Sequence, residues 1–433
     1  MAWAGDNAAR RGAFFLLLLV LSAPVFAAPP AKDFSGQPPG ATVEDLLAWA
    51  EQHNAELVAL QHESEAAAAR VQSAGALPDP VLRIELQDIT RDNTESPSLL
   101  PSQVGSTKYT VLQTLPLWGK RELRSDIARA EIDQAKSRRL SLSSELSSRI
   151  KTDFAQHYQT YRATLLTREM LQLLRDLERV VQTRYANGLA PQQDVIKAQL
   201  EQTALRAELI TLDTEQHHAR TRINSLLNRS ATAELAEPRA LRPVPRDAEL
   251  DSEKLLDRAQ RTNPALLAQA AQITVAESTQ QLIKKNRYPD LTLGISPIQR
   301  SNRIASWDFM VEFNIPLQQS TRRSQEAEAS AMFAAATVRK QAIASQIRGE
   351  LDQALTGLEG ARAQEDLLKH SLIPQAELTF QSALAGYQTG KVDFATLLEA
   401  QRQIRQARIS QLKAQMEQQT RLADVERIVG EDL

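Results

Sequence analysis

A short Tyr/Gly sequence that occurs twice places the strongest limit on what this chain can form. The stretch Tyr185–Gly188 reads Tyr-Ala-Asn-Gly, and Tyr387–Gly390 reads Tyr-Gln-Thr-Gly. Each glycine can take the left-handed conformation that ends an α-helix, and the residues after it can cap the next helix. The sequence therefore predicts two helical hairpin tips, at about 185–191 and 387–393.

A second pair of similar stretches recurs at nearly the same spacing. Leu46–Leu57 resembles Leu255–Leu266, and each contains an Asn that can cap a new helix. Two recurring elements predict a duplicated chain, with repeat 1 at 41–238 and repeat 2 at 251–433. The Pro-rich segment 239–250 is the predicted linker between them.

Long helices dominate the predicted structure. Lys120–Asn187 contains neither Gly nor Pro, which predicts a helix of roughly 100 Å. The equivalent run in repeat 2, Thr321–Thr389, has Gly349, Gly357, Gly360 and Pro374 as expected kink points. The shorter helices after each tip, together with those before each strand pair, match the long helices in length. We therefore expect two short helices to lie end to end along each long one.

Each repeat also carries two segments with the alternation of a β-strand. In the first, Leu82, Ile84 and Leu86 alternate with Arg83 and Glu85. The predicted strands are 81–88 and 108–117 in repeat 1, and 289–296 and 306–317 in repeat 2.

The N-terminus has the features of a secretory signal. Arg10 and Arg11 precede an apolar run, and small residues follow, so residues 1–27 are the expected signal peptide and 28–40 a flexible arm. The rest of the chain has no apolar run long enough for a transmembrane helix. The chain has no cysteine, which excludes disulfides, thiolate metal sites and an N-terminal lipid on cysteine. If the protein is in a membrane, strands must hold it there.

Four strands cannot close a barrel in lipid. An open sheet edge is too costly there, and transmembrane barrels start at about eight strands, a size that leaves no sizeable lumen. Three chains would supply twelve strands. The sequence thus predicts a trimer that shares one barrel, with four polar residues facing the water-filled lumen: Arg83, Glu85, Asp308 and Glu312. The alternative is a soluble helical protein with two β-hairpins packed on its own surface.

Other functional classes find little support. The net charge of −2 gives no reason to expect nucleic acid as a partner. No phosphate loop, nucleophile elbow or convincing carboxylate pair is present, so we expect neither an enzyme nor a cofactor. Adjacent residues on a helix point about 100° apart, so His217 and His218 are not expected to chelate one metal ion.

The whole mature chain resembles the TolC family of outer-membrane efflux ducts. The features that carry the resemblance are the duplicated strand-and-helix layout, Leu115–Arg121 (Leu-Pro-Leu-Trp-Gly-Lys-Arg) at the exit from the second strand, Asn263-Pro264, and the paired tips. The Leu-Trp-Gly-Lys-Arg sequence is most similar to the branch that serves heavy-metal resistance pumps (CzcC-like).

The resemblance implies a mainly α-helical protein with a membrane β-barrel: a twelve-stranded trimeric barrel in the outer membrane and a long α-helical barrel across the periplasm. The expected partners are two sister copies, outer-membrane lipid, a periplasmic adaptor protein and an inner-membrane resistance-nodulation-division pump driven by protons. The implied function is passive conduction of substrate, here heavy-metal cations, to the exterior.

The resemblance also implies roles for residues at the tips. Asp194, Tyr387 and Glu399 match the aperture positions of the family. Val392 replaces a gate arginine, for which Lys391 could substitute, and Thr396 replaces an acidic residue. A ring of three Glu399 side chains would attract cations. The residues expected to dock the adaptor are Tyr185, Gly188, Leu189, Tyr387, Gly390 and Lys391.

Two competing functions remain open at this point. A periplasmic adaptor or structural coiled-coil protein would also carry a signal and long hairpins, although an adaptor needs only one hairpin within a β-rich domain. A duct for drugs or for a secreted protein would have the same architecture, because the pump and the adaptor select the substrate.

Overall fold

A computed structural model describes residues 38–90, 97 and 99–433. The expected signal peptide and residues 28–37 of the expected arm lie outside this part of the chain. The arm's last residues differ from the expectation, because Pro39 and Gly40 are buried. The carbonyl of Pro39 accepts a hydrogen bond from the Ala236 amide (3.1 Å), and that of Ala41 from Arg239 (3.0 Å). This end of the arm is therefore held against the end of repeat 1 and the start of the linker.

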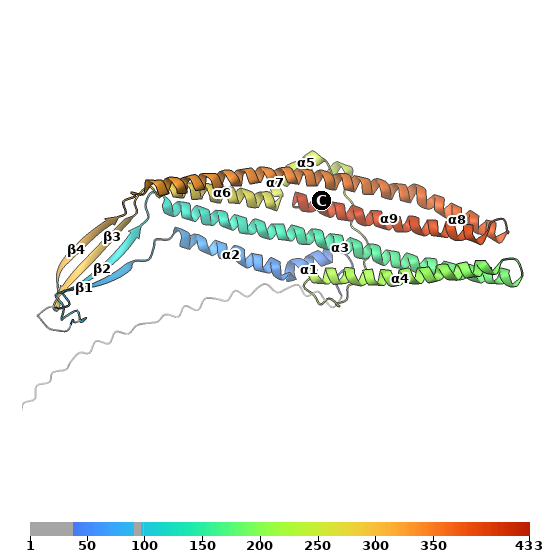
Figure 1. Cartoon of the computed structure of the whole chain (residues 1–433), viewed down its shortest axis with the longest axis horizontal. Coiled ribbons are helices and arrows are strands. Elements are labelled where there is room, and N and C mark those ends of the chain that lie inside the picture. Colours follow the sequence, from blue (N-terminus) through green and yellow to red (C-terminus); the bar gives the residue numbers. More distant parts are fainter. Residues whose placement is uncertain (1–37, 91–96, 98) are drawn as a thin grey trace, which may run out of the picture. The chain divides into compact units, whose positions relative to one another are not determined.

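The described elements alternate in the same order in both halves of the chain (Figure 1). The helices of the first half are α1 (Val43–His53), α2 (Ala55–Gly75), α3 (Lys120–Ala186) and α4 (Gln192–Leu226). Those of the second half are α5 (Ser252–Thr262), α6 (Pro264–Lys285), α7 (Gln319–Leu367), α8 (Ile373–Gln388) and α9 (Phe394–Val429). The strands are β1 (Val81–Gln87), β2 (Ser106–Leu115), β3 (Leu291–Arg300) and β4 (Arg303–Phe313).

Both hairpin tips form as the sequence predicts. Gly188 and Gly390 each have φ +73°, in the left-handed region. The amide of Leu189 donates to the Arg184 carbonyl (2.7 Å), and that of Lys391 donates to the Gly386 carbonyl (2.8 Å). These bonds satisfy carbonyls that the helix end leaves free. The tips lie at the opposite end of the helices from the strands (Figure 1).

Two asparagines join the short helices end to end. Asn54 caps α2 with its side-chain oxygen, and its amide nitrogen donates to the Leu226 carbonyl at the end of α4 (3.1 Å). Asn263 caps α6 in the same way and donates to the Ile428 carbonyl in α9 (2.8 Å). Each asparagine thus satisfies free backbone groups of two helices at once. This confirms the expected end-to-end pairing along the long helices.

The helix of repeat 2 changes its winding next to proline. A π-helical turn, Leu368–Leu372, separates α7 from α8 immediately before Pro374. Proline has no amide to donate and its ring crowds the carbonyl four residues earlier, so the ladder widens there. Gly349, Gly357 and Gly360 lie inside α7 without such a change. Of the four expected kink points, only Pro374 therefore coincides with a change in helical winding.

One buried histidine makes stability depend on pH. His157 in α3 is 3% exposed, and burial, with the nearby charge of Arg220, lowers its pKa from 6.5 to about 4. Between these values the unfolded chain binds more protons than the folded chain, so stability falls as the pH falls. From about pH 7.5 to about pH 5.5 we expect a loss of about 1.4 kcal/mol.

Urea unfolding of His157→Gln across this pH range checks the prediction, because the variant lacks this contribution. His218→Gln, at an exposed position of α4, is the matched control and should keep the dependence of the unchanged chain. The same pH dependence in His157→Gln as in His218→Gln would contradict it.

Candidate functional site

The four strands form one antiparallel sheet in the order β1-β2-β3-β4. β2 pairs with β3, for example Leu112 with Gly294, so the sheet joins the two halves of the chain. In the described part of the chain, β1 pairs only with β2 and β4 only with β3. The sheet therefore has two edges whose outward backbone groups are free to pair with another strand.

One face of the sheet is apolar and exposed. The register places Leu82 opposite Val111, Val111 opposite Ile295, and Ile295 opposite Phe309. These four side chains are between 45% (Val111) and 71% (Phe309) exposed. The same face carries Ile84, Trp307, Val311 and Phe313, all at least half exposed. A continuous exposed apolar face of this kind is typical of a surface that contacts lipid or another chain.

The opposite face is polar. By register it carries all four residues expected in the lumen, Arg83, Glu85, Asp308 and Glu312, together with Lys108. Lys108 Nζ lies 2.9 Å from an Asp308 carboxylate oxygen, and Arg83 lies 3.9 Å from Glu85. The hydroxyls of Thr110 and Ser296 form a hydrogen bond with each other (2.8 Å). The predicted lumen residues thus share one face of the sheet. Ion pairs and a hydroxyl–hydroxyl hydrogen bond give some of the polar side chains on this face a partner.

The Trp-Gly-Lys-Arg sequence joins the sheet to the helices. Trp118 and Gly119 both have positive φ, which turns the chain from β2 into α3. Buried Lys120 donates to the Tyr288 carbonyl and to the Asp290 carboxylate, each at 2.8 Å. Trp118 Nε1 donates to the carbonyl of Pro289 (3.1 Å). This sequence therefore fixes the β2–α3 turn of the first half to the α6–β3 turn of the second half.

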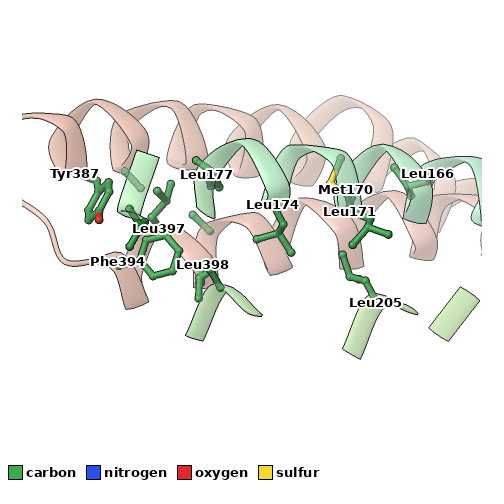
Figure 2. Close-up of a cluster of buried hydrophobic side chains, with 14 residues drawn as sticks. Leu166, Met170, Leu171, Leu174, Leu177, Leu205, Tyr387, Phe394, Leu397 and Leu398 are labelled. Carbon is green, nitrogen blue, oxygen red and sulfur yellow. The ribbon is translucent and has the colours of Figure 1, made fainter. Parts of the chain in front are cut away.

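At the other end, a hydrophobic cluster unites the two hairpins. It contains side chains of α3, α4, α8 and α9 (Figure 2). Its buried members are Leu166, Met170, Leu171, Leu174, Leu177, Val181, Ala198, Leu205, Ala383, Tyr387, Phe394, Leu397, Leu398 and Ala400. The Tyr387 and Phe394 rings lie 5.4 Å apart between centroids. The two tips are thus packed together by apolar contact within one chain.

Two of the three expected aperture residues, Asp194 and Tyr387, are buried. Tyr387 is 4% and Asp194 8% exposed. Burial, followed by the charge of Asp194, raises the pKa of Tyr387. Burial also raises the pKa of Asp194, and the charge of Asp393 adds to this while Lys197 opposes it. Both side chains are therefore partly desolvated.

The third expected aperture residue, Glu399, is elsewhere on the surface. It is exposed on α9, five residues after Phe394 and hence about 140° around the helix. Its carboxylate accepts a hydrogen bond from Gln403 at 3.4 Å. Among the described residues, no contact joins Glu399 to Asp194 or Tyr387. Within one chain the three residues therefore do not form one cluster.

The residues expected to dock the adaptor also differ in their exposure. Tyr185 and Leu189 are 47% and 65% exposed, and Lys391 is exposed. Gly188 and Gly390 form the turns. Tyr387 differs from the expectation, because it is buried between Arg184 and Phe394 and has no surface to offer a partner.

Several important residues were not singled out from the sequence. Arg184 contacts Tyr387 across the tips, and Lys120 joins the two halves below the sheet. Lys151, Arg242 and Glu426 form a buried charge cluster in the helical part. Lys120 lies inside the Leu115–Arg121 sequence and Arg184 directly precedes the first tip, but their partners are in the other half of the chain. No local pattern marks such long-range pairs.

The described residues contain neither a metal-binding cluster nor a membrane-spanning helix. In the described part of the chain, no group of three or more His, Asp or Glu side chains could hold a metal ion. The rings of His217 and His218 lie 6.5 Å apart between centroids. Within the same residues, no helix is both long and apolar enough to cross a membrane.

Comparison with known proteins gives a consistent result. Residues 46–229 and 255–431 match the model of the family described as outer membrane efflux protein. The cobalt-zinc-cadmium resistance protein CzcC of Cupriavidus metallidurans is 24% identical over 401 residues, which cover 90% of each chain.

Solved structures with the same fold include those of VceC and CusC. The outer membrane protein VceC of Vibrio cholerae has a TM-score of 0.74 at 16% identity, with 90% of this chain and 96% of VceC covered. CusC, whose structures concern transmembrane channel formation, has a TM-score of 0.76 at 16% identity, with 95% and 98% covered. The likeness extends over at least nine-tenths of this chain in both cases.

Proposed function

The chain belongs to the outer membrane efflux protein family, and on that premise we propose that three copies of it form one continuous duct from the periplasm to the cell exterior. Membership makes the chain an outer-membrane efflux channel that extends into the periplasm, and not an enzyme. A periplasmic adaptor, one alternative weighed from the sequence, is contradicted by this membership.

The four-stranded sheet is the observation that best supports a trimer. One chain presents four strands with an exposed apolar face and two unpaired edges. In lipid the edges must pair, so β1 of one copy meets β4 of the next. Eight strands would be filled by their own side chains, whereas twelve leave a lumen. Arg83, Glu85, Asp308 and Glu312 would then line the water-filled passage.

The oligomeric state and the conductance of the purified protein test this proposal together. The detergent-solubilised protein should have the mass of three chains in native mass spectrometry. The same sample should produce discrete ion-conducting steps in planar lipid bilayers. A monomer that never conducts would overturn the proposal.

We infer that the duct works with a periplasmic adaptor and an inner-membrane pump, as the family resemblance implies. The exposed tip residues Tyr185, Leu189 and Lys391 support docking of a partner at this end. Cross-linking at Leu189 should then capture the adaptor. Cysteine can be introduced there without interference, because the chain has none.

Heavy-metal cations are the substrate class that the similarity to CzcC supports, since CzcC is a cobalt-zinc-cadmium resistance protein. A deletion strain should lose tolerance to cobalt, zinc or cadmium and regain it when the gene is restored. Unchanged tolerance to all three metals, with increased sensitivity to a drug, would favour the duct for drugs instead.

A further inference from the structure

An exposed pair of aromatic rings lies where the sheet meets the helices. The rings of Trp118, after β2, and Tyr288, after α6, lie 5.1 Å apart between centroids, with 31° between their planes. Their side chains are 52% and 47% exposed. Exposed Trp and Tyr rings, each with an apolar body and a polar group, are typical of the boundary between lipid and water.

Exposed apolar side chains continue from the sheet to this junction. Just beyond the ends of β2 and β4, Leu117, Ile315 and Leu317 are 39%, 67% and 80% exposed. Each of the four strands begins or ends here, beside the ends of α2, α3, α6 and α7 (Figure 1). The junction is therefore the level at which the proposed lipid contact of the sheet gives way to water.

Basic residues are in excess on the helical side of the aromatic pair. Segments 284–290 and 315–326 carry five basic and two acidic residues, whereas the net charge of the whole chain is −2. Both acidic residues already have partners, because Asp290 pairs with Lys120 and Glu326 with Arg287. The positive charge of this region is therefore not neutralised within the chain.

Three of these cations are available to an outside anion. Lys284, Lys285 and Arg323 are exposed, and within the described ranges none of them forms an ion pair. Lys284 only donates to the side-chain oxygen of Gln280, at 3.3 Å. Long Lys and Arg stems can lie along apolar surface while their charged ends extend into the polar region.

We propose that Trp118, Tyr288, Lys284, Lys285 and Arg323, together called the junction surface, bind anionic phospholipid headgroups on the periplasmic side of the outer membrane. This role rests on the proposed placement of the sheet in lipid. The rings lie at the boundary of the apolar chains, and the cations reach the headgroup phosphates. A sister copy in a ring would bring the same positive charges to the same level, which opposes its covering this surface instead.

Fluorescence quenching by lipids with brominated acyl chains tests the proposal. Trp49→Phe/Trp307→Phe leaves Trp118 as the reporter, since Trp3 is in the expected signal peptide. The full chain is placed in vesicles of phosphatidylcholine and phosphatidylglycerol, with one lipid brominated at a time. We expect Trp118 to prefer phosphatidylglycerol by about fivefold or more, roughly the contribution of one lysine or arginine near an anionic surface. High salt should reduce this preference by screening the charges.

Two double variants on the same background separate the junction surface from charge in general. Lys285→Gln/Arg323→Gln should lower the preference by about fivefold or more. Arg339→Gln/Lys340→Gln is the matched control, because it removes two exposed cations that lie about 24 Å farther along α7. This control should keep the preference of the unchanged surface.

Trp307 provides a second reporter, on the apolar face of the sheet, where it is 62% exposed. In Trp49→Phe/Trp118→Phe we expect both brominated lipids to quench it about equally.

The lipid-binding role would be overturned if Trp118 showed no preference, or if both double variants changed the preference equally. Quenching of Trp307 without quenching of Trp118 would also overturn it, because another protein or a sister copy would then cover the junction. If lipid quenched neither tryptophan, the sheet would not be in lipid, and the proposed duct would be contradicted as well.

Discussion

Replacing Glu426 with alanine is expected to lower the free energy of unfolding by about 3–5 kcal/mol, because it leaves Arg242 without its carboxylate partner and buried Lys151 with only the exposed Asp432. Glu426 and Lys151 are both about 3% exposed, and their charged groups lie 2.7 Å apart. Arg242 donates to both carboxylate oxygens, at 2.9 and 3.0 Å. The carboxylate thus connects α3, α9 and the segment between the two repeats.

Urea unfolding followed by helical circular dichroism measures this loss. Glu417→Ala is the matched control on the same helix, because Glu417 pairs with Arg421 and both side chains are 40% exposed. An exposed pair contributes at most about 1 kcal/mol. The double variant Lys151→Met/Glu426→Met should be more stable than Glu426→Ala, because it removes a buried cation together with its partner. If Glu426→Ala and Glu417→Ala lower the free energy of unfolding by the same amount, the buried charge cluster does not stabilise the fold as proposed.

Local patterns were sufficient to predict the elements. Gly188 and Gly390 mark the tips because the turn requires a left-handed backbone conformation, which glycine adopts most readily. Alternation along the first strand placed Arg83 and Glu85 on one face of the sheet and Leu82 and Ile84 on the other. Side chains on a strand alternate between the two faces whatever the partner strand is. These predictions needed no knowledge of tertiary contacts, and the structure confirms them.

Contacts between the repeats could not be predicted in this way. Tyr185 and Tyr387 are equivalent in the duplication, but one is exposed and the other buried. Their neighbours decide this: Phe394 packs on Tyr387, whereas the equivalent position in the first tip is Gln192. The pairing of β2 with β3, and hence of Lys108 with Asp308, likewise depends on strands from different halves of the chain.

A lysine at Phe309 is expected to destabilise the membrane sheet by about 2–4 kcal/mol per chain, the cost of a cation on the lipid face near the bilayer midplane. Phe309 is 71% exposed on the apolar face, opposite Ile295. Its sequence neighbour Met310 pairs with Gly294 and points to the polar face. Met310→Lys is therefore the matched control, with the same new side chain one residue away on the face proposed to meet water.

The yield of heat-resistant trimers in outer-membrane fractions measures the effect. We expect Phe309→Lys to reduce this yield strongly and Met310→Lys to reduce it little, because only the first cation must lose its hydration in lipid. The comparison separates burial in lipid from a general intolerance of charge in β4. Equal loss in both variants would contradict the assignment of the two faces, and a larger loss with Met310→Lys would reverse it.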